Sequence, residues 1–206
     1  MKATTTLALK CADGVIMATD TRATMLPGFV AHKRVKKLYM VTRNIGMTIA
    51  GVPAEAINLL DILRANASIY QYQRKRIVPV RAVASLASTL LFSQRYYPYM
   101  IQVILGGYDS EGYHLFNLDP FGSTIEDNLI ATGSGSPVAY GVLESGYNEK
   151  IQLKDGLELA ARAIMSAMKR DVYTGDNFDI AIITEEKGFV ELSEEEKKNL
   201  LKKETR

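Results

Sequence analysis

The chain has 206 residues, of which 47% are hydrophobic and 23% are charged, and its formal net charge is +2. These values predict one globular domain with a sizeable core, and the near balance of charge gives no support to nucleic-acid or membrane binding. Cys11 is the only cysteine, which excludes disulfides within the chain and favours a reducing, intracellular setting. Neither His32 nor His114 belongs to a zinc-binding motif, so we expect no metal site.

The N-terminus has only a faint similarity to a secretory leader. Lys10 interrupts its apolar run, and the residue before Cys11 is not small. Nowhere does the sequence approach the about 18 apolar residues that span a bilayer. We therefore expect a cytoplasmic protein without a membrane segment.

Strand patterns dominate the first fifty residues. Residues 4–9 and 15–19 flank the turn signal Asp13-Gly14 and predict a hairpin. Residues 38–41 and 45–51 predict a second pair of strands. Pro53 then opens a helix, in which apolar residues recur at helical spacing as far as Tyr70.

The remaining chain continues in the same segregated manner. The predicted elements are a helix over 81–94, strands over 101–105 and 113–116, helices from about 137 and over 153–169, and strands over 179–184 and 189–192. Ser193 and Glu196 form a capping box for a short, charged helix that we expect on the surface. Runs of strands alternating with pairs of helices predict an α+β fold with helices packed on antiparallel sheets.

Three consecutive threonines, Thr4, Thr5 and Thr6, stand almost at the start of the chain. Taken alone they are best explained by the strand propensity of threonine. A threonine that becomes the first residue of a chain has another use, however. Its hydroxyl can attack a carbonyl carbon, and its own α-amine, with a pKa of about 7.7–8.0, can accept the proton.

Six short segments give these threonines a context. They are Asp-Thr-Arg-Ala-Thr at 20–24, Val-Lys-Lys-Leu at 35–38, Gly-Met-Thr-Ile-Ala-Gly at 46–51, Gly-Ser-Gly-Ser at 133–136, Tyr-Gly-Val-Leu-Glu-Ser at 140–145 and Arg-Asp-Val-Tyr-Thr-Gly at 170–175. Each is common alone, but in this order they resemble the proteasome β-subunit family over residues 4–184. The resemblance implies a four-layer αββα sandwich of two antiparallel sheets flanked by helices, the N-terminal-nucleophile hydrolase fold. It also implies a propeptide of residues 1–3 and a single domain of residues 4–206.

The resemblance carries functional roles to particular residues. It makes Thr4 the nucleophile, freed by cleavage between Ala3 and Thr4, and makes Gly51 the donor of an N–H group to the oxyanion. The implied supporting residues are Asp20, Lys37, Ser134, Asp171 and Thr174. A lysine ammonium beside Thr4 would lower the pKa of its hydroxyl and amine, and Asp20 would keep that lysine charged. Ser134, Asp171 and Thr174 would hold the freed amine and position water.

The family's substrate pocket maps to Ala23, Val35, Ile49 and Pro53. All four are apolar, which favours cleavage after hydrophobic residues, because a charged side chain would lose its hydration there without a partner. The chain departs from the family pattern twice: Ala3 replaces the usual glycine before the nucleophile, and Thr174 replaces the usual serine. Alanine restricts the backbone more than glycine does, so processing is expected to be slow or to depend on other subunits.

The resemblance implies a threonine endopeptidase subunit of the 20S proteasome core, activated from a zymogen by autocatalytic cleavage and needing no cofactor or metal. Its expected partners are other β subunits in a heptameric ring, rings of α subunits, an ATPase activator and unfolded protein substrates. The sequence lacks the long helix that precedes the first strand of α subunits, which favours a β subunit. The main alternative is a structural β subunit of the same particle that retains residues 1–3 and does no chemistry.

Two other readings stay open. The first is a simpler bacterial double-ring threonine protease, but the sequences of that family differ from this chain after the second strand. A nucleic-acid-binding module could use the basic runs at 32–37 and 74–76, but such runs are more often solvated or at subunit contacts, and they lack the interleaved aromatics of a binding face.

Overall fold

The computed structural model describes residues 4–25 and 28–204, which form twelve strands and five helices. The first half contains β1 (Thr5–Cys11), β2 (Gly14–Asp20), β3 (Ala23–Met25), β4 (Phe29–His32), β5 (Leu38–Thr42), β6 (Ile45–Gly51), α1 (Pro53–Arg74) and α2 (Val80–Ser93). The second half contains β7 (Ile101–Asp109), β8 (Gly112–Leu118), β9 (Thr124–Glu126), β10 (Leu129–Gly133), α3 (Ser136–Gly146), α4 (Leu153–Arg170), β11 (Phe178–Thr184), β12 (Gly188–Glu191) and α5 (Glu194–Glu204).

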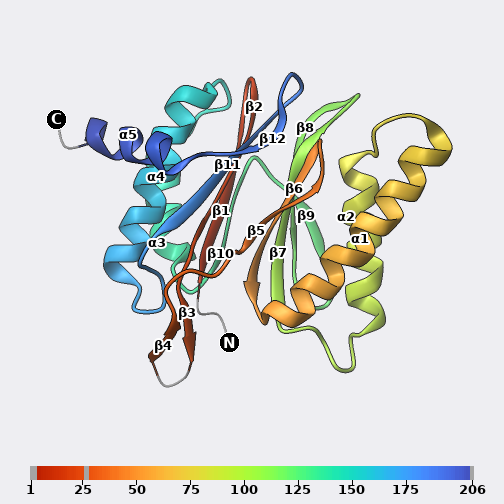
Figure 1. The fold of residues 1–206 in the computed structure, drawn as a ribbon, viewed down its shortest axis with the longest axis horizontal. Helices are drawn as coiled ribbons and strands as arrows, with labels where there is room; N and C mark the ends of the chain where they lie inside the picture. The colour runs from red at the N-terminus through yellow and green to blue at the C-terminus, as the bar shows by residue number, and fades with distance from the viewer. Residues whose placement is uncertain (1–3, 26–27, 205–206) are drawn as a thin grey trace.

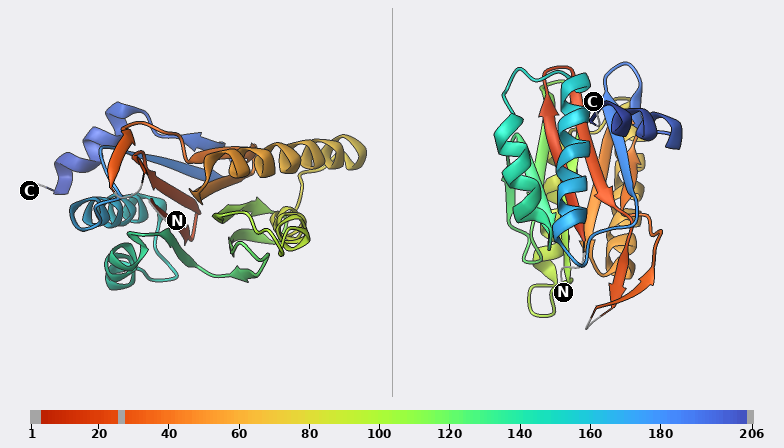
Figure 2. Two further views of the ribbon diagram at one scale, coloured as in Figure 1. Left: turned by 90° about the horizontal axis from the view of Figure 1, so that it is seen from below. Right: turned by 90° about the vertical axis from the view of Figure 1, so that its left-hand side faces the viewer.

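Two five-stranded antiparallel sheets lie face to face between two pairs of helices (Figures 1 and 2). One sheet has the strand order β10-β1-β2-β11-β12, and the other has the order β5-β6-β7-β8-β9. Helices α3 and α4 cover the first sheet, whereas α1 and α2 cover the second. The predicted four-layer αββα sandwich is therefore confirmed.

Three apolar clusters join the layers. The first packs α1 and α2 on their sheet, through residues such as Leu60 and Val103. The second packs α3 and α4 on the other sheet. The third lies between the sheets and includes Met17 and Ile104, both fully buried. None of the helices in the described part of the chain combines the length and apolarity needed to cross a membrane.

The sequence analysis missed four strands. Strands β3 and β4 form a separate two-stranded hairpin, and β9 is a short, exposed edge strand. The most consequential omission is β10, whose five residues are all buried and pair with β1. Its short apolar run leads directly into the Gly-Ser-Gly-Ser turn, and the sequence analysis assigned no strand to it.

The C-terminal capping box is confirmed, because the Ser193 N–H donates to Glu196 Oε2 at 2.7 Å and the Glu196 N–H donates to Ser193 Oγ at 3.3 Å. The expectation of a merely solvated helix was incomplete. Within α5, Lys197 is 4% exposed.

Candidate active site

One end of the sandwich brings the predicted site residues together because neighbouring strands run antiparallel. Thr4 immediately precedes β1, Asp20 ends β2 and Ser134 follows β10. The pairings Thr5↔Gly133 and Thr6↔Thr19 place these three chain positions at the same sheet edge. Gly133 has φ +91°, and a Cβ there would collide with the Thr4 carbonyl oxygen, so the close approach of β10 requires glycine.

Lys37 reaches this edge from the other sheet, where it precedes β5. Its side chain is almost fully buried, and Nζ donates to Thr4 Oγ1 at 2.6 Å. Nζ also donates to Asp20 Oδ1 at 2.8 Å and to the Arg22 carbonyl oxygen at 2.6 Å. These three acceptors use all three hydrogens of an ammonium group, so the group is held in one orientation beside the Thr4 hydroxyl.

Asp20 is fully buried, and four donors surround its carboxylate. The Thr5 N–H and Lys37 Nζ donate to Oδ1, at 3.0 and 2.8 Å. The Arg22 N–H and the Gly175 N–H donate to Oδ2, at 3.1 and 3.2 Å. Every lone-pair direction is therefore occupied, as a buried charge requires.

Burial affects the two charges of this pair in opposite directions. It lowers the pKa of Lys37 and raises the pKa of Asp20, while the attraction between the two groups opposes both shifts. The positive charge of Arg22 adds to the lowering of the Lys37 pKa. A lysine with a lowered pKa, 2.6 Å from a hydroxyl oxygen, is suited to exchange a proton with it.

Ser134, Asp171 and Thr174 form a chain of contacts on the other side of Thr4. The Thr4 N–H donates to Ser134 Oγ at 3.3 Å, and Ser134 Oγ donates to Asp171 Oδ2 at 2.5 Å. Thr174 Oγ1 donates to the same Asp171 oxygen and lies 2.6 Å from Thr5 Oγ1. Of these three residues, Ser134 alone hydrogen-bonds Thr4. Asp171 and Thr174 therefore support Thr4 only indirectly.

All four predicted pocket residues line one cavity of about 230 Å³, which Thr4 and Lys37 also line. Ala23 comes from β3, Val35 from the segment before β5, Ile49 from β6 and Pro53 from the start of α1. Gly51 lines the same cavity with φ +134°, and a Cβ there would collide with the Met100 carbonyl oxygen. Arg22, Thr24, Lys36 and Val52 complete the lining.

Arg22 is a site residue that the sequence analysis did not single out. Its carbonyl oxygen accepts from Lys37, and its N–H donates to Asp20. Its guanidinium binds Asp176 at 3.0 Å and the Val172 carbonyl oxygen at 2.8 Å. The sequence offered one signal, the place of Arg22 in the Asp-Thr-Arg-Ala-Thr segment. An arginine two residues after Asp20 does not by itself indicate a functional site.

The two basic runs do not form a common cationic face. In the first, Lys37 is buried, Arg34 pairs with Glu194 and Lys36 pairs with Glu191. In the run 74–76 at the end of α1, the cationic groups of Lys75 and Arg76 lie over the rings of Tyr72 and Tyr70. The charges of Arg34, Lys36 and Lys37 in the first run are therefore paired with acidic residues of the same chain.

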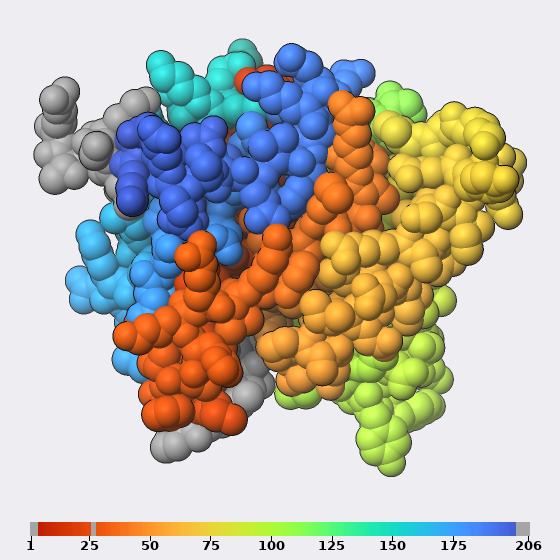
Figure 3. Space-filling view, in the orientation of Figure 1, coloured from red at the N-terminus to blue at the C-terminus, as the bar shows by residue number. Residues whose placement is uncertain are grey.

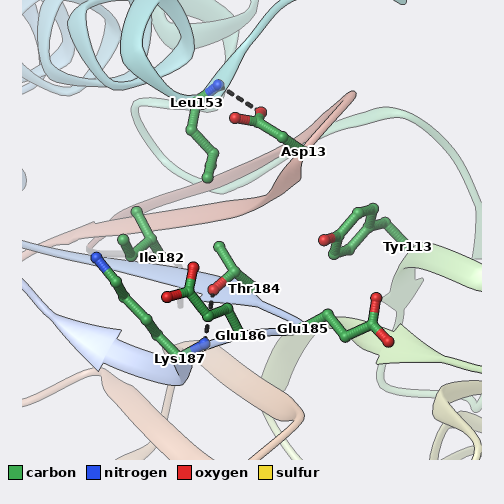
Figure 4. A pocket seen from close by; sticks show the side chains of 8 residues that line it. All are labelled: Asp13, Tyr113, Leu153, Ile182, Thr184, Glu185, Glu186 and Lys187. Atoms are coloured by element: carbon green, nitrogen blue, oxygen red, sulfur yellow. Dashed lines mark hydrogen bonds between the residues drawn. The ribbon is translucent and has the colours of Figure 1, made fainter.

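A larger hollow of about 600 Å³ lies at the opposite ends of the strands, next to the β1–β2 and β11–β12 turns (Figure 4). Figure 4 shows Asp13 turned toward the start of α4, where its Oδ1 accepts the Leu153 N–H at 2.7 Å. None of the predicted site residues lines this hollow. Among the described residues, no group of three or more His, Cys, Asp or Glu side chains is placed to hold a metal ion.

Comparison with known proteins identifies similar chains. A family model described as "Proteasome subunit" matches residues 1–183. "Proteasome subunit beta" of Archaeoglobus fulgidus is 47% identical over 203 residues, which are 98% of this chain and 94% of the relative. The proteins of the same name from Ferroglobus placidus and Methanothermobacter thermautotrophicus are 46% and 44% identical, over 98% and 95% of this chain and 96% and 93% of the relatives.

Proposed function

This chain belongs to the proteasome subunit family, as a catalytic β subunit of the core particle, and on that premise we propose that it is a threonine endopeptidase whose nucleophile is Thr4. The observation that carries the proposal is the 2.6 Å contact between Lys37 Nζ and Thr4 Oγ1, with Asp20 on the other side of the lysine. A structural β subunit would have no need to bury a lysine against the Thr4 hydroxyl.

The first proposed step is activation of the chain itself. Residues 1–3, including Ala3, lie outside the described residues, and the cleavage is a proposal. Thr4 Oγ1 attacks the carbonyl carbon of Ala3, the bond to the Thr4 nitrogen breaks, and an ester forms. Water then hydrolyses that ester, which releases residues 1–3 and leaves a free α-amine on Thr4.

Peptide hydrolysis follows the same chemistry. Lys37 in its neutral form takes the proton from Thr4 Oγ1 as the oxygen attacks the substrate carbonyl. The Gly51 N–H stabilises the resulting oxyanion, and the proton passes to the leaving amine. Water attacks the acyl ester in the second half of the reaction. The freed α-amine, held by Ser134, accepts a proton from that water, and Thr4 Oγ1 regains a proton as the ester bond breaks and the acid product leaves.

The four apolar residues that we assign to the substrate pocket support cleavage after hydrophobic residues. Ala23, Val35, Ile49 and Pro53 offer no partner for a charged side chain, which would be desolvated there. Fluorogenic peptides ending in Leu or Tyr are expected to be cleaved faster than those ending in Arg or Glu. Faster cleavage of the charged peptides would contradict this assignment of the pocket.

The proposed setting is cytoplasmic and oligomeric. We propose heptameric β rings stacked between rings of α subunits, supplied with unfolded proteins by an ATPase activator. Isolation of the particle and counting of its subunits by native mass spectrometry tests this arrangement. A stable monomer in the presence of α subunits would contradict it.

The deciding experiment is the intact mass of the subunit from the assembled particle, combined with peptidase assays. We expect a loss of residues 1–3, activity in the wild type and none in Thr4→Ala. A chain that retains Ala3 on every copy would lack the α-amine and would support the structural alternative. Thr5→Ala is the comparison variant, because the hydroxyl of Thr5, the next residue, contacts Thr174 Oγ1 and not Lys37.

A further inference from the structure

Lys197 is a buried lysine in α5, a charged helix whose first residues, Glu194 to Glu196, are exposed and whose Leu200 packs on the cluster of α3 and α4. Its Nζ donates to the Phe178 carbonyl oxygen at 2.9 Å, to Glu194 Oε1 at 2.8 Å and to Asp179 Oδ1 at 3.3 Å. All three ammonium hydrogens have acceptors, and the charge lies 5.8 Å from the centre of the Phe178 ring. Lys197 therefore anchors α5 to the start of β11.

Two acidic residues, Glu194, which this anchor holds, and Glu191, which ends β12, bind a segment far away in the sequence. Glu194 Oε1, which accepts from Lys197, also accepts from Arg34 at 3.0 Å. Glu191, at the end of β12, accepts from Lys36 at 2.5 Å. Figure 3 shows α5 in dark blue on the surface beside the orange segment that follows β4. The C-terminal part of the chain thus holds residues 33–37 from outside.

Residues 33–37 form one wall of the active site. Val35 and Lys36 line the substrate cavity, and Lys37 contacts Thr4. Backbone hydrogen bonds tie this segment to its surroundings: the Val35 N–H donates to the Thr21 carbonyl oxygen at 2.8 Å, and the Ile49 N–H of β6 donates to the Lys37 carbonyl oxygen at 3.0 Å. Thr21 Oγ1 donates to the Lys33 carbonyl oxygen at 2.9 Å, and the Tyr39 hydroxyl donates to the Lys36 carbonyl oxygen at 2.6 Å. The segment belongs to no strand or helix, so the ion pairs of Arg34 and Lys36 add to these few hydrogen bonds in fixing its position.

We propose that Lys197 is a positioning residue for the peptidase reaction: it fixes α5 on β11 so that Glu194, through Arg34, holds the Val35 wall of the substrate pocket in place. This rests on the proposed function. The effect falls on substrate binding rather than on the chemical step, because Lys37 has its own partners in Asp20 and the Arg22 carbonyl oxygen.

The test replaces Lys197 with methionine in the assembled particle and uses Lys198→Met as the matched control. Lys198 is the next residue of the same helix and is exposed, so the control makes the same change of charge without touching the anchor. Because the variant loosens one exposed ion pair, that of Arg34 with Glu194, KM for a Leu-ending peptide is expected to rise about fivefold in Lys197→Met. We expect kcat within about twofold of the wild type, which is the signature of lost substrate binding.

A second measurement does not depend on catalysis. Hydrogen exchange followed by mass spectrometry reports the protection of the Val35 N–H in a peptide covering residues 33–37. Exchange of this peptide is expected to accelerate in Lys197→Met and to stay unchanged in Lys198→Met. If Lys197→Met fails to assemble, Glu194→Ala removes the shared carboxylate at an exposed position and is expected to give a smaller effect in the same direction.

Unchanged KM and unchanged exchange in Lys197→Met would overturn the proposal, as would equal effects of the Lys197 and Lys198 variants. A fall in kcat at constant KM would also overturn it, because the role would then lie in the chemistry. A wild type without peptidase activity would refute the proposed function instead, and the exchange data would still decide whether Lys197 orders residues 33–37.

Discussion

Replacement of Asp20 by asparagine tests the charged pair at the centre of the site. The carboxylate accepts from Lys37 and from three backbone N–H groups, those of Thr5, Arg22 and Gly175. Asparagine has the same shape but one acceptor oxygen, so its amide N–H₂ must face two of these donors. It also leaves the Lys37 ammonium buried without its counter-charge. Breaking a buried pair from one side costs about 3–5 kcal/mol, and we expect a loss in this range at pH 7.

The pH dependence of this loss is specific to Lys37. Burial already lowers its pKa, and removal of the Asp20 charge lowers that pKa further. Between the lowered value and the ordinary value of about 10.4, the unfolded chain binds one proton more than the folded chain, so stability rises with pH. The deficit of the variant relative to the wild type is therefore expected to shrink as the pH is raised from 7 toward 10.

The assay is urea-induced unfolding of the unassembled subunit, followed by circular dichroism at several pH values. The double variant Asp20→Asn/Lys37→Met is the control, because it removes the unpaired charge and is expected to recover a large part of the loss. A deficit below about 1 kcal/mol at pH 7, or one that does not change with pH, would refute the reasoning.

Three further predictions concern the chemistry, the oxyanion loop and the pocket. Lys37→Arg keeps the charge, but a guanidinium does not deprotonate, so kcat is expected to fall at least about 100-fold while circular dichroism stays native. In the wild type, kcat is expected to rise with pH through the lowered pKa of Lys37. An active Lys37→Arg variant would contradict this role. Gly51→Ala forces a Cβ against the Met100 carbonyl oxygen at φ +134°, and urea unfolding is expected to show a loss of about 3 kcal/mol. Val35→Glu supplies a counter-charge in the pocket wall, so the ratio of cleavage after Arg to cleavage after Leu is expected to rise about tenfold with fluorogenic peptides; an unchanged ratio would remove Val35 from the pocket.

Local pattern was sufficient for most of the fold. The hairpin of β1 and β2 and the helix from Pro53 follow from period-2 and helical apolar spacing, which are properties of short windows. Strand β10 was not predictable in this way, because its place beside β1 depends on a pairing between residues about 125 positions apart. Lys197 is similar, since a lysine in a charged helix is buried only when a distant carbonyl oxygen, here that of Phe178, accepts from it.

The candidate site was predicted through resemblance rather than through pattern. Nothing in the local sequence distinguishes Lys37 from Lys36, yet one is buried against Thr4 and the other lies in an exposed ion pair. The distinction arises because Lys37 immediately precedes β5, where the chain turns inward. Arg22 was missed because its contribution to Lys37 is made by a backbone carbonyl oxygen, which every residue type carries.

The convergence of Thr4 with Ser134 and Asp171 also controls when the site can first exist. During synthesis, Thr4 is added to the chain long before Asp171, because the two residues are far apart in the sequence. At about 5–20 residues per second, their synthesis is separated by roughly 10–30 s. Throughout that interval Thr4 has neither Ser134 nor Asp171 beside it, and the Gly175 N–H that holds Asp20 has not been made. The nascent chain therefore cannot form this site while it is still being synthesised among other growing polypeptides. The site can exist only after the fold is complete.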